Sequence, residues 1–140
     1  MGMKWQTTEQ LKQLLCRLVQ YPSISGTEVE VRLAQYIADQ LLTLDYFRGI
    51  NELVQLHPTG DGRYFVTALV KKAEQVRDTV ILLSHFDVVD VQDYGAWKDA
   101  AFSPEELTKR FYEQKPQLPA DVQADMEAGE WLFGRGVMDM

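Results

Sequence analysis

The chain has 140 residues, enough for one compact domain, and its 46% hydrophobic and 25% charged residues are typical of soluble globular proteins. Its 14 Lys and Arg against 21 Asp and Glu give a formal net charge of −7, which argues against nucleic acid as a partner. A single cysteine excludes an internal disulfide. The absence of an apolar run of about 18 residues argues against a membrane span, and the polar N-terminus argues against a secretory signal, so we expect a cytoplasmic protein.

Two amphipathic helices are predicted at the start of the chain. The first covers Thr8 to Val19, where apolar residues recur at the i, i+3, i+4, i+7, i+8 spacing. Tyr21-Pro22-Ser23 ends it, because proline disfavours a helical conformation for the residue before it. The second begins at Thr27, whose hydroxyl can cap the helix while Glu30 reaches back in a capping box.

The middle of the chain predicts strands. Two stretches rich in β-branched and aromatic residues, Glu52 to His57 and Arg63 to Lys71, flank the turn-forming segment Pro58 to Gly62, a pattern typical of an antiparallel hairpin. Thr79 to Leu83 is a continuous apolar run, as expected of a central strand covered on both faces. The charged link from Lys71 to Asp78 is interpreted as a turn.

From Val88 onwards we expect mostly loop, with one helix. Ser103 can cap that helix, and Glu106 completes a second capping box. Trp131-Leu132-Phe133 is predicted to be a short strand that leads into Gly134-Arg135-Gly136. Helices followed by strands, with a central apolar strand among them, predict an α/β domain in which a mixed β-sheet is flanked by helices.

The first candidate site follows the apolar run, in Ser84-His85-Phe86-Asp87. In open α/β sheets, ligands bind at the carboxyl ends of strands. Residues two apart in an extended segment point the same way, which places His85 and Asp87 on one side. A carboxylate beside an imidazole suits zinc, because it can fix the tautomer of the ring. The alternative is a surface ion pair at the end of a strand.

The second candidate is Gly134-Arg135-Gly136 with Asp139 shortly after it. The glycines permit a tight turn, and an aspartate at its end can bridge two metal ions with its two oxygens. Arg135 could hold a carboxylate or make a structural hydrogen bond near the turn. The alternative for the whole motif is a structural turn, and it lacks the Gly-Lys-Ser/Thr ending of a phosphate-binding loop.

Both motifs, in this order, resemble one family. The segment Leu82 to Val89, then Trp97 and Phe102, then Gly134 to Met140 is similar to the zinc metallopeptidase family of aminoacylase, glutamate carboxypeptidase, tripeptidase and succinyl-diaminopimelate desuccinylase. That family has His-x-Asp-Val-Val after a buried strand, then a Trp and a Phe, then Gly-Arg-Gly before Asp-Met-Lys. Ser84 departs from it, because the family usually has glycine there.

A finer resemblance lies between the motifs. This stretch is longer than usual for the family, and with Val91-Gln92-Asp93-Tyr94-Gly95 it is similar to the branch named for bacterial arginine utilisation (RocB-like). The resemblance implies a di-zinc hydrolase that cleaves amide or peptide bonds of a small-molecule amino-acid derivative or peptide, with a place in arginine degradation. Residues 1–140 would then be the N-terminal portion of its catalytic domain.

The resemblance also implies roles for three residues. His85 would bind one Zn²⁺, Asp87 would act as a catalytic residue that orients His85, and Asp139 would bridge both Zn²⁺ ions. The general base, the remaining ligands and a lid domain for homodimerisation would follow Met140, so we expect the 140-residue chain alone to be inactive. If His85 and Asp139 share one metal, their donor atoms should lie within about 6 Å without it.

Two other classes of function stay open. The first is a non-catalytic interaction or regulatory domain that retains the fold without its chemistry. The second is a nucleotide-binding α/β domain that uses Gly60-Asp61-Gly62 or Gly134-Arg135-Gly136, although neither glycine pair has the spacing that such sites require.

Overall fold

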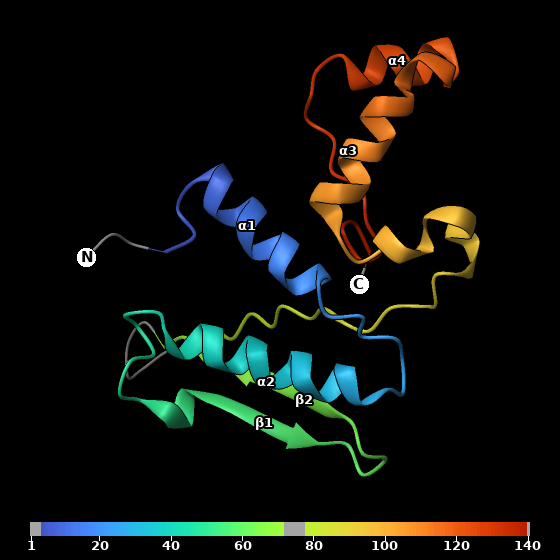
Figure 1. The fold of residues 1–140 in the computed structure, drawn as a ribbon. Coiled ribbons are helices and arrows are strands. Elements are labelled where there is room, and N and C mark those ends of the chain that lie inside the picture. The colour runs from blue at the N-terminus through green and yellow to red at the C-terminus, as the bar shows by residue number, and fades with distance from the viewer. Residues whose placement is uncertain (1–3, 72–77, 140) are drawn as a thin grey trace. The chain divides into compact units, whose positions relative to one another are not determined.

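The computed structural model describes residues 4–71 and 78–139 (Figure 1). Contacts within the chain divide it into two compact units, one formed by Met1–Pro22 with Val88–Met140 and the other by Ser23–Asp87. The turn predicted between Lys71 and Asp78 lies largely outside the described residues. Among the helices of the described residues, none has both the length and the apolar character needed to cross a membrane.

The unit Ser23–Asp87 begins with helix α2 (Glu28–Leu42), which confirms the predicted second helix. The predicted capping box is wrong. Thr27 is the N-cap residue, but its hydroxyl donates to the Ile24 carbonyl at 2.7 Å. The Thr27 amide already donates to the same carbonyl at 3.0 Å, so the Glu30 carboxylate accepts from the Gly26 amide instead, at 2.8 Å.

The predicted hairpin is confirmed. After a short 3₁₀ helix, η1 (Asn51–Leu53), strands β1 (Val54–Pro58) and β2 (Tyr64–Ala68) pair antiparallel with Val54 opposite Ala68. Residues 59–63 connect them. Helix α2 runs along this two-stranded sheet and covers one of its faces (Figure 1).

The core of this unit lies between α2 and the hairpin. Ala38, Phe47 and Val54 are buried together. Partly buried apolar side chains surround them: Leu41, Leu42, Leu44, Leu53, Leu56 and Val66. The sequence therefore folds locally as an amphipathic helix laid on a hairpin.

The prediction of a buried central strand at Thr79 to Leu83 is wrong. The segment is not in a strand, and Ile81, Leu82 and Leu83 are 82%, 92% and 95% exposed. An apolar run indicates burial only when neighbouring strands are available on both sides, and the sheet formed by the described residues has two strands, β1 and β2. The fold is therefore roughly α/β, with a small antiparallel sheet in place of the expected layered mixed sheet.

The other unit is mainly helical. Helix α1 (Thr8–Val19) has the predicted bounds and carries a capping box between Thr7 and Gln10. The predicted helix after Ser103 is confirmed as α3 (Pro104–Gln114), and α4 (Ala120–Met126) was not predicted. Two 3₁₀ helices complete the unit, η2 (Gln92–Ala100) and η3 (Lys115–Gln117). More of this stretch is thus helical than the expected loop.

Two further details differ from the predictions. Ser103 is the N-cap of α3, but its hydroxyl makes no capping bond and its carbonyl accepts from the Leu107 amide at 2.9 Å. The segment Trp131 to Phe133 is not a strand. Its Phe133 ring stacks on Phe111 with centroids 4.3 Å apart, and the Phe133 amide donates to the Thr108 hydroxyl at 2.8 Å. Packing on α3 therefore replaces strand pairing.

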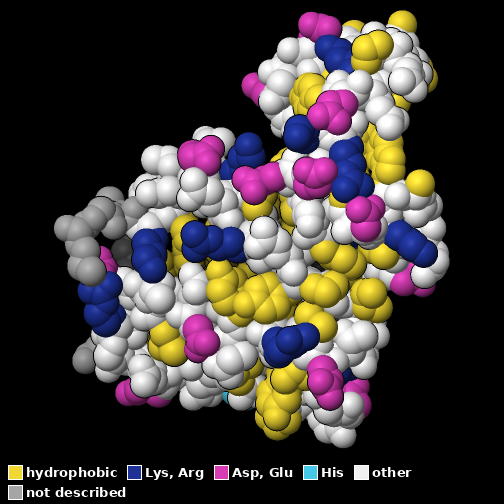
Figure 2. Space-filling view, in the orientation of Figure 1, with side chains coloured by type: hydrophobic (Ala, Val, Ile, Leu, Met, Phe, Trp, Pro, Cys, Tyr) yellow, Lys and Arg dark blue, Asp and Glu magenta, His cyan; other side chains and the backbone are white. Residues whose placement is uncertain are grey.

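Charged side chains of both signs are interspersed on the face drawn in Figure 2. Several are paired within one unit. Arg110 donates to Asp99 at 3.0 Å and to Glu106 at 2.9 Å, and Lys115 lies 2.5 Å from Glu127. Such exposed pairs contribute little stability each, because water and salt screen them, so the fold depends mainly on its buried apolar contacts.

Candidate functional site

His85 and Asp87 lie side by side in the extended segment that follows the apolar run. The Nδ1 atom of His85 is 3.1 Å from the carbonyl oxygen of Asp87 and 3.4 Å from its Oδ1. The predicted pairing of the two residues is therefore confirmed. The carbonyl oxygen is a hydrogen-bond acceptor, and so is Oδ1 when the carboxyl group is ionised. A neutral His85 ring therefore carries its proton on Nδ1, which leaves Nε2 as the nitrogen able to bind a metal.

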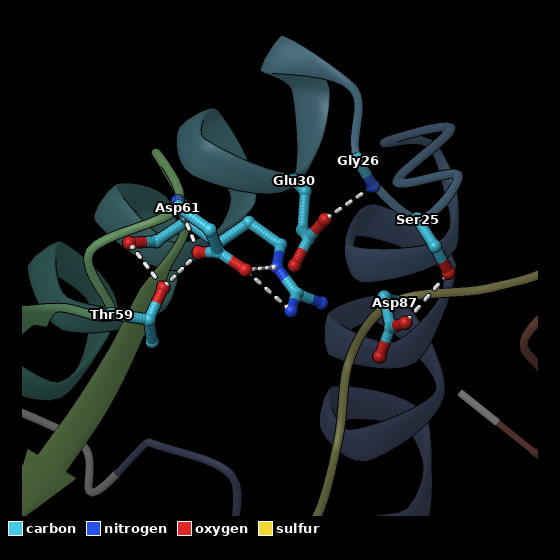
Figure 3. Close-up of polar contacts among 7 residues, drawn as sticks. Ser25, Gly26, Glu30, Thr59, Asp61 and Asp87 are labelled. Atoms are coloured by element: carbon cyan, nitrogen blue, oxygen red, sulfur yellow. Dashed lines mark hydrogen bonds and ion pairs between the residues drawn. The ribbon is translucent and has the colours of Figure 1, made fainter.

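Asp87 is itself held by Ser25, a residue that the sequence analysis did not find. The Ser25 hydroxyl donates to Asp87 Oδ2 at 2.6 Å, as the dashed line in Figure 3 shows. This hydrogen bond is the main cause that lowers the pKa of Asp87, and the nearby His85 lowers it further. Asp87 therefore favours its ionised form beside the imidazole.

A second serine ties the same two stretches of chain together. The hydroxyl of Ser23, which is 1% exposed, donates to the Phe86 carbonyl at 2.7 Å. Ser23 and Ser25 are two apart, a spacing that points both side chains the same way in an extended segment. The Ser-x-Ser spacing is visible in the sequence, but it does not indicate Phe86 or Asp87 as the partner, because these residues lie 63 and 62 positions away.

The turn between β1 and β2 adds a positive charge to this unit. Arg63 donates to Asp61 Oδ2 through Nε at 2.8 Å, and Thr59 also donates to the Asp61 carboxylate (Figure 3). The pKa of Arg63 is raised chiefly by the Asp61 hydrogen bond, with smaller contributions from the charges of Glu30 and Asp87. The guanidinium is thus held mainly by Asp61, and Ser25 and His85 remain the side chains that lower the pKa of Asp87.

The Gly134-Arg135-Gly136 motif forms a turn, as predicted. Gly136 has a φ of 86°, in the left-handed region that glycine adopts at least cost. Gly134 has a different role, because a Cβ there would lie 2.9 Å from Val137 Cγ2 and 3.3 Å from Pro104 Cγ. Asp139 follows this turn on an exposed stretch.

His85 and Asp139 belong to different units, so the expected distance of about 6 Å between their donor atoms stays a prediction. Within residues 4–71 and 78–139, no three or more His, Cys, Asp or Glu side chains are grouped so as to hold a metal ion. The roles of His85, Asp87 and Asp139 at zinc stay predictions as well.

Arg135 makes contacts that fit a structural role. Its guanidinium donates to the Asp93 carboxylate and lies 4.9 Å from the centroid of the Tyr94 ring. Its backbone amide donates to the Ala101 carbonyl at 2.8 Å. The hydrogen bond lowers the pKa of Asp93 and raises that of Arg135. Arg135 therefore binds a carboxylate of its own unit.

We expect Asp93→Asn to reduce stability at pH 7 and to have less effect in acid. Arg135 lowers the pKa of Asp93 in the folded state, so this stabilisation is fully present above the unfolded value of about 3.9 and is lost as the pH falls through the lower, folded value. Urea unfolding of both proteins across the acid range measures the difference. Asp125→Asn, an exposed position in the same unit, is the control, and a difference that does not change with pH would contradict the expectation.

Comparison with known proteins gives two relatives, both from Bacillus subtilis (strain 168). The chain is 54% identical over 138 residues to "Uncharacterized protein YqjN", and the matched region covers 99% of this chain and 25% of YqjN. It is 33% identical over 135 residues to "Protein RocB", and the matched region covers 94% of this chain and 24% of RocB. The chain is thus similar to RocB over nearly all of its own length.

The chain spans about a quarter of the length of these curated relatives. No family model matches it, and no solved structure matches it. The sequence relationship to RocB agrees with the resemblance to the RocB-like branch, at the level of one shared segment.

Proposed function

We propose that this chain is part of a RocB-like, zinc-dependent hydrolase that cleaves amide or peptide bonds of amino-acid derivatives or small peptides, in arginine degradation. The observation that carries the proposal is the pairing of His85 with Asp87, at 3.4 Å between Nδ1 and Oδ1, on a chain 33% identical to RocB. The proposal includes a cytoplasmic location and a homodimer in the longer protein.

The candidate ligand atoms of this chain, an imidazole nitrogen and carboxylate oxygens, are of the types that bind zinc. An imidazole whose Nδ1 faces a carboxylate is a common zinc ligand, because the carboxylate fixes the ring and raises its basicity. His85 would bind through Nε2, and Asp139 would supply carboxylate oxygens. Catalytic zinc takes three protein ligands and an open position, so the complete centre would need further ligands and a general base. When bound, zinc would lower the pKa of a bound water and polarise the scissile carbonyl.

The residues of this chain would serve that centre by orientation. Asp87 would hold the His85 ring with Nε2 toward the metal, and its negative charge would stabilise the ring when it donates to a cation. Asp87 would therefore act electrostatically. Alone, the 140-residue chain would bind zinc weakly and hydrolyse neither acylated amino acids nor dipeptides.

The experiment is a zinc titration of the 140-residue chain, followed by the NMR signals of its two histidine rings. We expect zinc to shift the His85 signals at high micromolar to millimolar concentrations and His85→Ala to abolish binding. His57→Ala is the matched control, because the His57 Nε2 pairs with the Thr67 hydroxyl at 2.9 Å and its ring stacks on Phe65. Zinc that binds His85→Ala as well as the unchanged chain would overturn the proposal and leave a non-catalytic interaction domain.

A further inference from the structure

We infer that Ser25 is a positioning residue of the candidate site: its hydroxyl fixes the Asp87 carboxylate, which in turn fixes the tautomer of the His85 ring. All the contacts involved lie within the unit Ser23–Asp87, and the functional role of Ser25 rests on the function proposed above. Nothing in the sequence motifs points to Ser25, because 62 positions separate it from Asp87.

The Asp87 carboxylate divides its two oxygens between two partners. Oδ2 accepts from the Ser25 hydroxyl at 2.6 Å (Figure 3). Oδ1 lies 3.4 Å from His85 Nδ1. A short hydrogen bond to an ionised acceptor is among the stronger ones in proteins. It holds the carboxylate against rotation about its last side-chain bond, so that Oδ1 keeps facing the ring.

Ser25 is in turn held firmly from both sides. Before it, Ser23 is bonded to the Phe86 carbonyl at 2.7 Å. After it, the Gly26 amide donates to the Glu30 carboxylate of α2 at 2.8 Å, and the Thr27 amide donates to the Ile24 carbonyl at 3.0 Å. The start of α2 therefore provides a fixed support for the hydroxyl, whereas His85 and Asp87 themselves lie in no helix or strand.

Without Ser25, the carboxylate would lose its fixed partner. The Asp87 side chain is 33% exposed and that of His85 is 60% exposed, so water can compete for both. The carboxylate would then turn among several orientations. The ring would keep the Asp87 carbonyl, 3.1 Å from Nδ1, as its one fixed acceptor of the two, so its preference for a proton on Nδ1 would weaken without being lost. Ser25 thus acts on the ring through Asp87, and we assign it no contact with substrate or metal.

The test is ¹⁵N NMR of the histidine rings in the metal-free 140-residue chain at about pH 9, where histidine is neutral. We expect His85 to carry its proton mainly on Nδ1. In Ser25→Ala, the ratio of the Nδ1–H to the Nε2–H form should fall by about threefold to tenfold, because the ring loses a fixed carboxylate but keeps the Asp87 carbonyl beside Nδ1. Ser25→Thr, which keeps the hydroxyl, should restore the ratio to within about twofold.

Ser84→Ala is the matched control, because the Ser84 hydroxyl lies next to His85 but bonds to the His85 carbonyl at 3.3 Å. An unchanged ratio in Ser25→Ala, or an equal change in Ser84→Ala, would overturn the inference. The ring signals of His57 report whether the hairpin stays folded. If Ser25→Ala unfolds the hairpin, Ser25→Cys replaces it, because cysteine has a similar size and is a weaker hydrogen-bond donor. The same fall in the ratio of the Nδ1–H to the Nε2–H form is then expected.

The zinc titration separates this inference from the proposed function. A tautomer shift in Ser25→Ala together with zinc binding that needs His85 supports both. A tautomer shift with no His85-dependent zinc binding supports the role of Ser25 and overturns the hydrolase proposal. An unchanged tautomer with His85-dependent zinc binding overturns the role of Ser25 and leaves the hydrolase proposal standing.

Discussion

Phe47→Ala is expected to destabilise the unit Ser23–Asp87 by about 3–5 kcal/mol. Phe47 is 4% exposed and lies in the buried cluster with Ala38 and Val54. Removing its ring leaves a cavity where α2 meets the hairpin, and the cost combines lost apolar burial with that cavity. The effect would be a large part of the stability of so small a unit.

The control is Leu82→Ala in the same unit, at a side chain that is 92% exposed. We expect a change within about 0.5 kcal/mol, as for surface positions in general. Because all three tryptophans lie outside residues 23–87, hydrogen exchange of amides in the hairpin, such as the Leu69 amide bonded to the Leu53 carbonyl at 2.8 Å, is the suitable measurement. A cost at Leu82 of several kcal/mol would show that the run is buried after all.

Gly134→Ala is expected to cost about 1–3 kcal/mol through overpacking. The φ of Gly134 lies outside the left-handed region, so the backbone itself accepts alanine. The penalty arises because the new Cβ would lie 2.9 Å from Val137 Cγ2, closer than real Cβ atoms approach. Unfolding followed by tryptophan fluorescence measures it, since Trp97 and Trp131 belong to this unit.

The double variant Gly134→Ala with Val137→Ala is the control for this cause. It removes the Cγ2 atom that the new methyl would meet, so the two substitutions should be non-additive, with part of the Gly134→Ala cost recovered. Strict additivity would contradict the packing explanation. A neutral Gly134→Ala would mean that the turn moves away from Pro104 at little cost.

Elements defined by local patterns were predicted well. The bounds of α1 follow from its apolar spacing and the proline after it, and the β1–β2 hairpin follows from two β-rich stretches around a glycine-containing turn. Both signals depend on residues within a few positions of one another. Helix α4 (Ala120–Met126) gave no such signal, because it is short and its apolar residues alternate with polar ones instead of recurring at the helical spacing.

Predictions that depend on distant partners failed or stayed open. The run Thr79 to Leu83 has the composition of a central strand, but pairing needs neighbours that composition does not supply. The capping box at Thr27 failed because the Ile24 carbonyl engages both its amide and its hydroxyl. At the candidate site, spacing revealed the pair His85 and Asp87, whereas Ser25 could be found only from the fold.

The bonds from Ser23 to Phe86 and from Ser25 to Asp87 have a topological consequence. They join the first residues of the unit Ser23–Asp87 to its last, so the two ends of this continuous stretch of chain lie close together. A short linker from Asp87 back to Ser23, with new termini opened in the exposed turn at residues 59–63, should therefore give a circular permutant that folds.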